Sequence, residues 1–172
     1  MPPNVSPGLG PLSGKDPSVL ILGSFPSVIS LEKGEYYANK RNNFWHIMES
    51  LFGIDRDLPY DQRIAGLLDM GIALWDVISG CSREGSSDSG IKDVVPNDIP
   101  GFLHENPTIK CIALNGFTGA GKWFGRIYGD LPEYPDIAVM VLMSTSPANA
   151  GYTYEEKLSD WKKIIGFAGR KD

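Results

Sequence analysis

The stretch Val19-Leu-Ile-Leu22, followed at once by Gly23-Ser-Phe-Pro-Ser27, decides the fold class of this chain. Four consecutive apolar residues predict a buried parallel strand, and the glycine and proline after them end it abruptly. Two hydroxyls, an aromatic ring and several backbone N–H groups follow the carboxyl end of the strand. Open α/β sheets bind ligands at this place, so we expect residues 23–27 to form a ligand-binding loop.

A second polar segment follows this loop. Tyr36-Tyr37 precedes three asparagines, Asn39, Asn42 and Asn43, which lead into a predicted helix. Aromatic rings beside amide side chains can hold a planar, polar heterocycle. A nucleobase is therefore the ligand that this segment favours.

The rest of the chain alternates between strand and helix patterns. Apolar runs predict strands over 18–23, 71–78, 111–114 and 137–143. Helical spacing of apolar residues predicts helices over 42–53, 61–70, 98–106, 118–128 and 154–167. Residues 80–97 are expected to form a loop rich in Ser, Gly and Asp. This alternation indicates a parallel sheet with helices on both faces.

The size of the chain favours one domain. Of its 172 residues, 42% are hydrophobic, which is enough for a sizeable core. Residues 1–17 contain five prolines and three glycines without periodicity, so we expect a flexible tail before a single domain over 18–172. No apolar stretch approaches the length of a membrane span and no signal peptide is visible, which favours a cytoplasmic location without membrane contact.

Neither a metal site nor a disulfide framework is expected. Cys81 and Cys111 are the only cysteines, and an iron–sulfur cluster normally needs about four thiolates. His46 and His104 lack the spacing of metal ligands. We therefore expect reduced, buried thiols and no bound metal.

The net charge of −5 argues against a protein that coats nucleic acid, although an enzyme that visits DNA needs only a local basic rim. Candidates for such a rim are Lys40, Arg41, Arg83, Lys122, Arg126 and the pair Lys162-Lys163. The alternative is that most of them are ordinary solvated surface charges.

Gly116-Phe-Thr-Gly-Ala-Gly-Lys122 matches the phosphate-loop template G-x-x-x-x-G-K between a strand and a helix. The next residue is Trp123, however, where a Ser or Thr should bind Mg²⁺, and the following strand ends without the expected Asp. The pattern therefore disfavours ATP or GTP binding and favours a glycine-rich turn that allows close packing.

Ser24 and Ser27 resemble hydrolase nucleophiles because they lie at a strand-to-helix turn. Their surroundings lack the G-x-S-x-G pattern, and Pro26 would lie in the turn. His46 and His104, the two possible triad bases, both fall within predicted helices. A serine hydrolase is therefore disfavoured.

Ser144-Thr-Ser-Pro-Ala-Asn-Ala150 follows the last predicted strand. Hydroxyls, exposed amides and a proline at the carboxyl end of a strand can bind a phosphate backbone. The alternative is a plain turn of small polar residues. Because this segment and residues 23–27 are expected at the same sheet edge, we interpret them as two sides of one cleft.

Together these segments resemble the uracil-DNA glycosylase superfamily, in particular its hypoxanthine-DNA glycosylase branch, family 6. The matching segments are Gly23–Pro26, Tyr36–Trp45, Cys81–Ser89 and Ser144–Ala150, within a resemblance that covers residues 18–165. The resemblance implies an α/β protein, a three-layer α/β/α sandwich around a central four-stranded parallel sheet. It also implies that no metal or cofactor is needed.

Three positions depart from the wider superfamily. An Asp or Asn that places water usually precedes the proline of the first motif, where this chain has Phe25. The resemblance to family 6 transfers that role to Asn42. Ser144 stands where the last motif often has His or Asn, and Asp76 where uracil enzymes have the Asn that contacts the base edge. These changes favour a deaminated purine over uracil.

The resemblance and the chemistry of the side chains suggest individual roles. Tyr37 is the expected stacking partner of the base, and Phe25 the side chain that closes its other face. Asn42 is expected to orient water, unless it only caps the next helix, and Asn39 is a second catalytic candidate. Asn115 is expected either to bind the base or to cap a helix.

The base-binding candidates are Ser24, Phe25, Tyr37, Asp76, Asn115 and Ser144. The DNA-binding candidates are Ser27, Lys40, Arg41, Arg83, Ser146, Pro147, Ala148 and Asn149. We expect a monomeric, monofunctional DNA glycosylase whose partner is DNA with a deaminated base, hypoxanthine above all, with weak uracil activity. The alternative is a non-catalytic module on the same fold that binds nucleic acid or a nucleobase.

Overall fold

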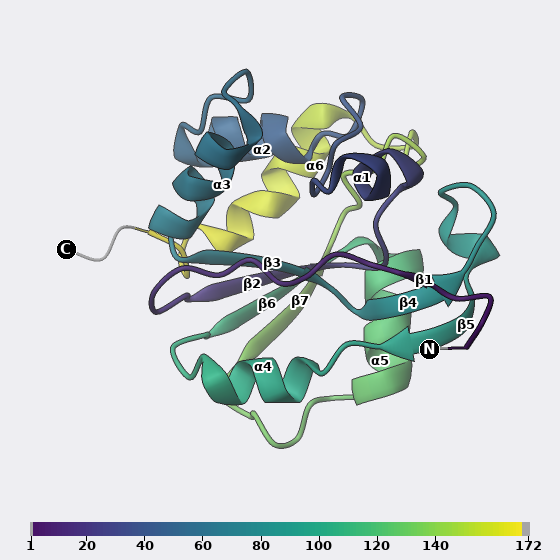
Figure 1. Ribbon diagram of the computed structural model, residues 1–172. Helices are drawn as coiled ribbons and strands as arrows, with labels where there is room; N and C mark the ends of the chain where they lie inside the picture. Colours follow the sequence, from purple (N-terminus) through teal and green to yellow (C-terminus); the bar gives the residue numbers. More distant parts are fainter. Residues whose placement is uncertain (1, 170–172) are drawn as a thin grey trace.

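The computed structural model of the protein describes residues 2–169 and has a four-stranded parallel sheet at its centre (Figure 1). The strands are β2 (Val19–Gly23), β3 (Ile72–Asp76), β6 (Cys111–Asn115) and β7 (Ala138–Leu142), in the order β3-β2-β6-β7. β2 is buried along its whole length, which explains its uninterrupted apolar sequence. The expected parallel sheet is confirmed.

Helices cover both faces of this sheet, as Figure 1 shows. Alternate residues of β2 point to opposite faces, so Val19 and Ile21 belong to one core cluster while Leu20 and Leu22 belong to the other. The first cluster includes residues of α2 (Phe44–Phe52), α3 (Tyr60–Asp69) and α6 (Tyr154–Trp161). The second includes residues of α4 (Ile99–Glu105) and α5 (Lys122–Tyr128). The three-layer α/β/α sandwich is confirmed.

Several helices differ from the sequence-based expectation at their ends. A short helix, α1 (Val28–Lys33), was not predicted and is capped by the Ser27 hydroxyl. The helix expected over 118–128 is a π-helical turn, Gly116–Gly121, that continues into α5. The helix expected over 154–167 ends at Trp161 and continues as the 3₁₀ turn Lys162–Ile164.

A second, antiparallel sheet corrects the expectation of a loop over residues 80–97. It consists of β1 (Ser6–Pro7), β4 (Ile78–Ser82) and β5 (Lys92–Pro96), in the order β1-β4-β5. The expected strand over 71–78 is divided because β3 ends at Asp76 and β4 begins at Ile78. Register shifts between β4 and β5 disturb the alternating pattern that identifies a strand in sequence.

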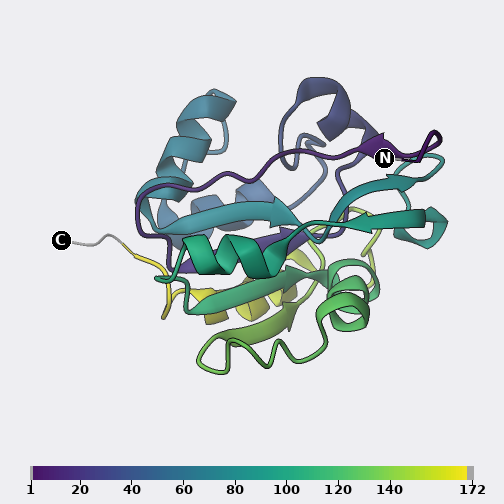
Figure 2. The same cartoon turned by 60° about the horizontal axis from the view of Figure 1, so that its bottom comes forward.

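The N-terminal segment, expected to be flexible, pairs with both sheets over the described part of residues 1–17. Gly8 N–H donates to the Ser79 carbonyl at 2.8 Å, and Leu12 exchanges two backbone hydrogen bonds with Leu74. Figure 2 follows this segment, in purple, along the sheet. Pairing between residues far apart in sequence needs no local periodicity, so composition alone did not indicate it. Met1 lies outside the described residues.

We expect a variant that lacks residues 1–12 to unfold about 2 kcal/mol more easily than the intact chain. The Tyr36 hydroxyl donates to the carbonyls of Leu9 and Gly10, and deletion would leave this buried group without either acceptor. Urea denaturation monitored by tryptophan fluorescence would measure the difference. Deletion of residues 1–4 is the matched control, because the described part of that stretch is exposed. Equal stability of both variants would show that the pairing is unimportant.

Candidate functional site

The register of the central sheet brings the candidate segments together. Gly23 pairs with Asp76, and Asn115 pairs with Leu142, two residues before Ser144. All of these strands are parallel, so their carboxyl ends lie at one edge. The loops that follow β2, β3, β6 and β7 therefore begin side by side, as expected from the sequence.

Asn115 connects three segments of this edge. Its amide group donates to the Thr145 hydroxyl at 2.9 Å and to the Tyr37 hydroxyl at 3.3 Å. Its side-chain oxygen accepts a hydrogen bond from the Thr145 backbone N–H at 3.0 Å. Asn115 makes no side-chain hydrogen bond to the turn that follows it, so the structure does not use it as a helix cap. Thr145, which is fully buried, was missed because it lies inside a segment interpreted as a phosphate-binding loop.

Tyr37 is held from one side by a second aromatic ring. Its ring stacks on that of Phe44, with 3.9 Å between centroids and an interplanar angle of 17°. Tyr37 adopts a φ of 54°, which is uncommon for a residue with a side chain. Burial, followed by the nearby charge of Asp76, raises the pKa of the Tyr37 hydroxyl, which therefore stays protonated.

Asp76 lies buried against the end of β2. A Cβ on Gly23 would be 2.5 Å from the Asp76 Oδ1, so only glycine fits there, and the Tyr37 hydroxyl would be 3.4 Å from the same Cβ. The other carboxyl oxygen, Oδ2, is buried without a hydrogen-bond partner in the described part of the chain. Burial raises the pKa of Asp76 to about 7, with Asp88 adding to the rise and Arg83 opposing it.

Ser24 is joined to a carboxylate that the sequence analysis did not select. The Ser24 hydroxyl donates to Asp88 Oδ1 at 2.6 Å, and Asp88 begins the 3₁₀ turn Asp88–Gly90 between β4 and β5. A Cβ on Gly119 would lie 2.3 Å from Asp88 Oδ2. Asp88 belongs to the segment Cys81–Ser89 that supports the family resemblance, which is the signal that could have identified it.

Phe25 is placed differently from its expected position on a base. Its ring is 8% exposed and belongs to the core cluster beneath the sheet that contains α4 and α5 residues. The Arg83 guanidinium lies 5.1 Å from the centre of this ring and donates to the Pro26 carbonyl. A large apolar side chain is more stable in the core than at a solvated ligand site, which explains the difference.

The side-chain oxygen of Asn42 makes a structural hydrogen bond, and its NH₂ group is left for a ligand. Its Oδ1 accepts the Phe44 N–H at 2.9 Å, so Asn42 binds the first turn of α2 although the N-cap position itself is Asn43. Among the described residues, no hydrogen bond from the Asn42 NH₂ group is found. Asn39 accepts two hydrogen bonds: its carbonyl accepts from Asn42 N–H, and its side-chain Oδ1 accepts from Arg41 N–H. The Asn43 N–H donates to the Thr145 carbonyl, which ties this segment to the loop after β7.

The polar side chains of residues 144–150 shape their own loop. The Ser144 and Ser146 hydroxyls accept from the N–H groups of Ser146 and Ala148. The Asn149 amide donates to the Ser144 carbonyl at 3.1 Å. Pro147 is partly exposed and Ala148 is exposed. The loop therefore presents a fixed backbone to any ligand at this edge.

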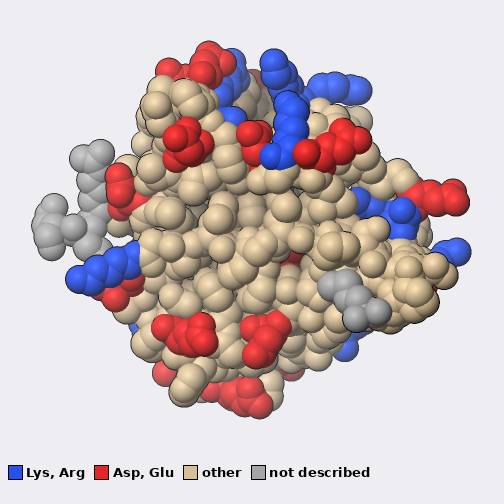
Figure 3. Space-filling view, in the orientation of Figure 1, with Lys and Arg blue, Asp and Glu red and all other residues tan. Residues whose placement is uncertain are grey.

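The basic candidates are divided between surface and structure. Lys40 and Arg41 are exposed, whereas Arg83 holds Pro26 and is partly buried. Ser27, a DNA-binding candidate, caps α1 by accepting from Ser30 N–H. Figure 3 shows charges of both signs on the upper part of one face, acidic side chains on the lower part and a mostly uncharged middle.

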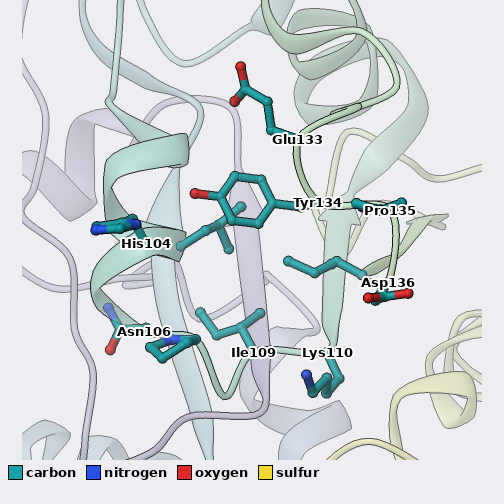
Figure 4. Close-up of a pocket in the computed structure, with 11 residues that line it drawn as sticks. His104, Asn106, Ile109, Lys110, Glu133, Tyr134, Pro135 and Asp136 are labelled. Atoms are coloured by element: carbon teal, nitrogen blue, oxygen red, sulfur yellow. The ribbon is translucent and has the colours of Figure 1, made fainter.

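A cavity of about 240 Å³ lies away from this site (Figure 4). Its lining includes Ile109 and Lys110, which precede β6, and Ile137, which precedes β7, so it lies at the opposite edge of the sheet. It contains none of the catalytic, base-binding or DNA-binding candidates.

Residues 2–169 contain no cluster of three or more side chains suited to a metal ion. Cys81 and Cys111 are buried free thiols. Within the same residues, no helix combines the length and apolar character required to cross a membrane.

A family model described as the uracil DNA glycosylase superfamily matches residues 11–165. The chain belongs to the uracil-DNA glycosylase superfamily. Among superfamily relatives, two Methanosarcina proteins named hypoxanthine DNA glycosylase are similar. The one from M. acetivorans is 35% identical over 86% of this chain and 89% of its own length, and the one from M. barkeri is 34% identical over 92% and 96%.

A solved structure supports the same superfamily fold. It is the solution NMR structure of an M. acetivorans protein that is proposed to be a uracil DNA glycosylase. The two structures superpose with a TM-score of 0.79 at 33% sequence identity, over 94% of this chain and 96% of that one. The resemblance inferred from four short segments is thus confirmed over most of the chain.

We expect Asp76→Asn to stabilise the protein at high pH. The buried carboxyl keeps its proton up to about pH 7, whereas the unfolded chain releases it near the ordinary value of 3.8. The folded state therefore binds more protons over this window, and the contribution of Asp76 to stability falls as pH rises. Relative to the natural protein, the variant should gain about 1–3 kcal/mol between about pH 5 and pH 8.

Urea denaturation at the two pH values measures this difference. Asp130→Asn, which changes an exposed carboxyl in the same way, is the matched control. A stability difference for Asp76→Asn that does not change with pH would contradict the assigned titration.

Proposed function

We propose that this protein is a monofunctional DNA glycosylase that hydrolyses the N-glycosidic bond of hypoxanthine in DNA. The supporting observation is the buried Asp76 carboxyl, whose Oδ2 has no hydrogen-bond partner among the described residues, on the same side of Gly23 as the Tyr37 hydroxyl and at the strand ends of a superfamily fold. Two relatives that match most of this chain are named hypoxanthine DNA glycosylase, which favours the same substrate here.

The base must leave the DNA stack before it can reach such a site. We assign the face of Tyr37 that is turned away from Phe44 to this base, so that Phe44, Tyr37 and the base form one stack. The rigid Phe44 ring, which is fully buried, would keep Tyr37 in place. Stacking of this kind accepts any planar base, so it supplies capture rather than selection.

Selection is assigned to Asp76. Hypoxanthine has an N1–H donor beside its O6 acceptor, whereas adenine has an acceptor at N1. A carboxylate accepts a hydrogen bond from N1–H, and a protonated carboxyl can donate to O6. Because the pKa of Asp76 is about 7, both forms are accessible near neutral pH. The same group fits the N3–H of uracil, which is consistent with the weak uracil activity expected from the sequence.

Bond cleavage builds positive charge on the sugar and negative charge on the leaving base. Asp88 reaches the end of β2 from the turn between β4 and β5, where it accepts from the Ser24 hydroxyl, and carboxylates placed near the sugar would stabilise its positive charge. The free NH₂ group and the second lone pair of Asn42 are assigned to the attacking water. The water oxygen bonds to the sugar, the electron pair of the glycosidic bond leaves with the base, and the proton that the water loses neutralises the base anion.

DNA contacts are assigned to the fixed backbone of residues 144–150 and to the exposed Lys40 and Arg41. A monomeric state and a cytoplasmic location complete the proposal. The alternative, a module that binds DNA without cutting the glycosidic bond, is separated from it by one assay. Alkali breaks a DNA strand only where a base has been removed, so strand breakage at a single hypoxanthine requires catalysis.

We expect Asn42→Ala to lower single-turnover excision of hypoxanthine by about 10²-fold, the scale typical of losing one preorganised polar group. DNA affinity should change much less. Asn42→Asp provides the matched comparison, because it keeps the oxygen that accepts Phe44 N–H but removes the NH₂ group. Normal excision by the alanine variant would limit Asn42 to its role at the start of α2.

Tyr37→Ala should weaken capture of the base by roughly 1–3 kcal/mol, the range for one base–aromatic stack. Tyr37→Phe should be nearly harmless, because Asn115 keeps its hydrogen bond to Thr145 when the tyrosine hydroxyl is lost. Single-turnover rates at increasing enzyme concentration separate capture from chemistry. Equal losses in both variants would indicate that the hydroxyl, and not the ring, contacts the base.

A further inference from the structure

Phe117 is an exposed aromatic ring at the edge of the sheet that bears the site. It is 62% exposed, the largest value among the exposed large hydrophobic side chains of residues 2–169. It follows β6 by two residues and so lies just beyond Asn115. Burying such a ring against a ligand would be favourable, so its exposure in the free protein requires an explanation.

The backbone that carries Phe117 is anchored on both sides. Gly116, Gly119 and Ala120 are buried, and only Phe117 and Thr118 project between them. A Cβ on Gly116 would lie 3.0 Å from the Ser144 Cβ, and one on Gly119 would lie 2.3 Å from Asp88 Oδ2. The turn is therefore packed against two walls of the candidate site.

The conformation of this turn is also fixed internally. It is a π-helical turn, in which Lys122 N–H donates to the Phe117 carbonyl. Gly116 has a φ of 106°, which a residue with a side chain rarely adopts. π-Helical turns are rare in proteins as a whole, and many of those that occur lie at functional sites. Because the backbone is already ordered, a ligand that contacts Phe117 would order little more than its side chain.

The loop on the other side of the site lacks a comparable side chain. After Pro147 it has only Ala148, Asn149 and Ala150, and the Asn149 amide is occupied by the Ser144 carbonyl. Small side chains cannot fill the space that an extruded nucleotide leaves in a duplex. Phe117 is the most exposed large hydrophobic side chain of the described residues and lies on the turn that packs against Ser144, whereas the exposed Tyr152 follows the end of the loop.

We infer that Phe117 inserts into the DNA stack at the position vacated by the extruded nucleotide. This inference rests on the proposed glycosylase function and adds the residue that holds the duplex open. An apolar wedge replaces the stacking that the lost base provided. The exposed Lys122, five residues further on, supplies a cation for the adjacent phosphates.

Three other exposed side chains support contact of this edge with DNA. Val28 and Ile29 follow the loop after β2, and Tyr152 follows the loop after β7. With Phe117, these side chains give exposed apolar surface to segments that follow three of the strand ends. Exposed apolar groups would contact bases or sugars, whereas the charged groups contact phosphates.

Phe117→Ala tests the inference. Single-turnover excision of hypoxanthine paired with cytosine in a duplex should fall by roughly 10-fold to 100-fold, since one base–aromatic stack is lost. Excision from single-stranded DNA should change by less than about twofold, because no stack has to be opened. Phe117→Trp, which keeps an aromatic ring, should retain most of the duplex activity. Because Phe117 is exposed, the substitution should leave thermal stability nearly unchanged.

Ile165→Ala is the matched control. Ile165 is 45% exposed and follows α6 and its terminal 3₁₀ turn, which return from the site to the other end of the sheet. This variant should excise hypoxanthine normally from both substrates.

The outcomes separate the inference from the function on which it rests. A natural protein that removes hypoxanthine, with Phe117→Ala equally active on duplex DNA, would overturn the wedge and leave the function intact. Equal losses on duplex and single-stranded DNA would also overturn it. A natural protein that removes no base from either substrate would overturn the proposed function itself.

Discussion

Backbone hydrogen bonds hold β2 between β3 and β6, so that Gly23 pairs with Asp76 and Leu22 pairs with Leu114. This register determines which loops share an edge, and it places Asp76 beside Gly23 and Asn115 beside Leu142. A shift of β3 by one residue would move Asp76 to the opposite face of the sheet. The absence of a side chain on Gly23 is what allows the Asp76 carboxyl to lie against β2.

The local sequence predicted those parts of the fold that short-range patterns specify. The apolar run of β2 and the helical spacing of α2 and α3 are such patterns, and their positions agree within two residues. The pairing of β4 with β5 and that of Leu12 with Leu74 depend on distant residues and left no periodic signal.

For the site, the sequence predicted which segments take part better than it predicted how their side chains are oriented. Tyr37, Asp76 and Asn115 lie together as expected, because Asp76 and Asn115 end neighbouring parallel strands and Tyr37 reaches them from the segment between α1 and α2. Phe25 was misplaced because its neighbours are loop residues, whereas its own apolar ring favours the core. Asp88 was overlooked because a single Asp in a Ser/Gly-rich stretch carries no spacing signal, and only the fold brings it to Ser24.

The N-terminal segment has a consequence for the behaviour of the chain in concentrated solution. β3 is an outer strand of the parallel sheet, and an outer strand offers unpaired backbone groups to other chains. Leu12 occupies those groups at Leu74, and Gly8 does the same for β4 at Ser79. Strand-to-strand aggregation through this edge therefore requires the segment to detach first, which links colloidal stability to a local unfolding step.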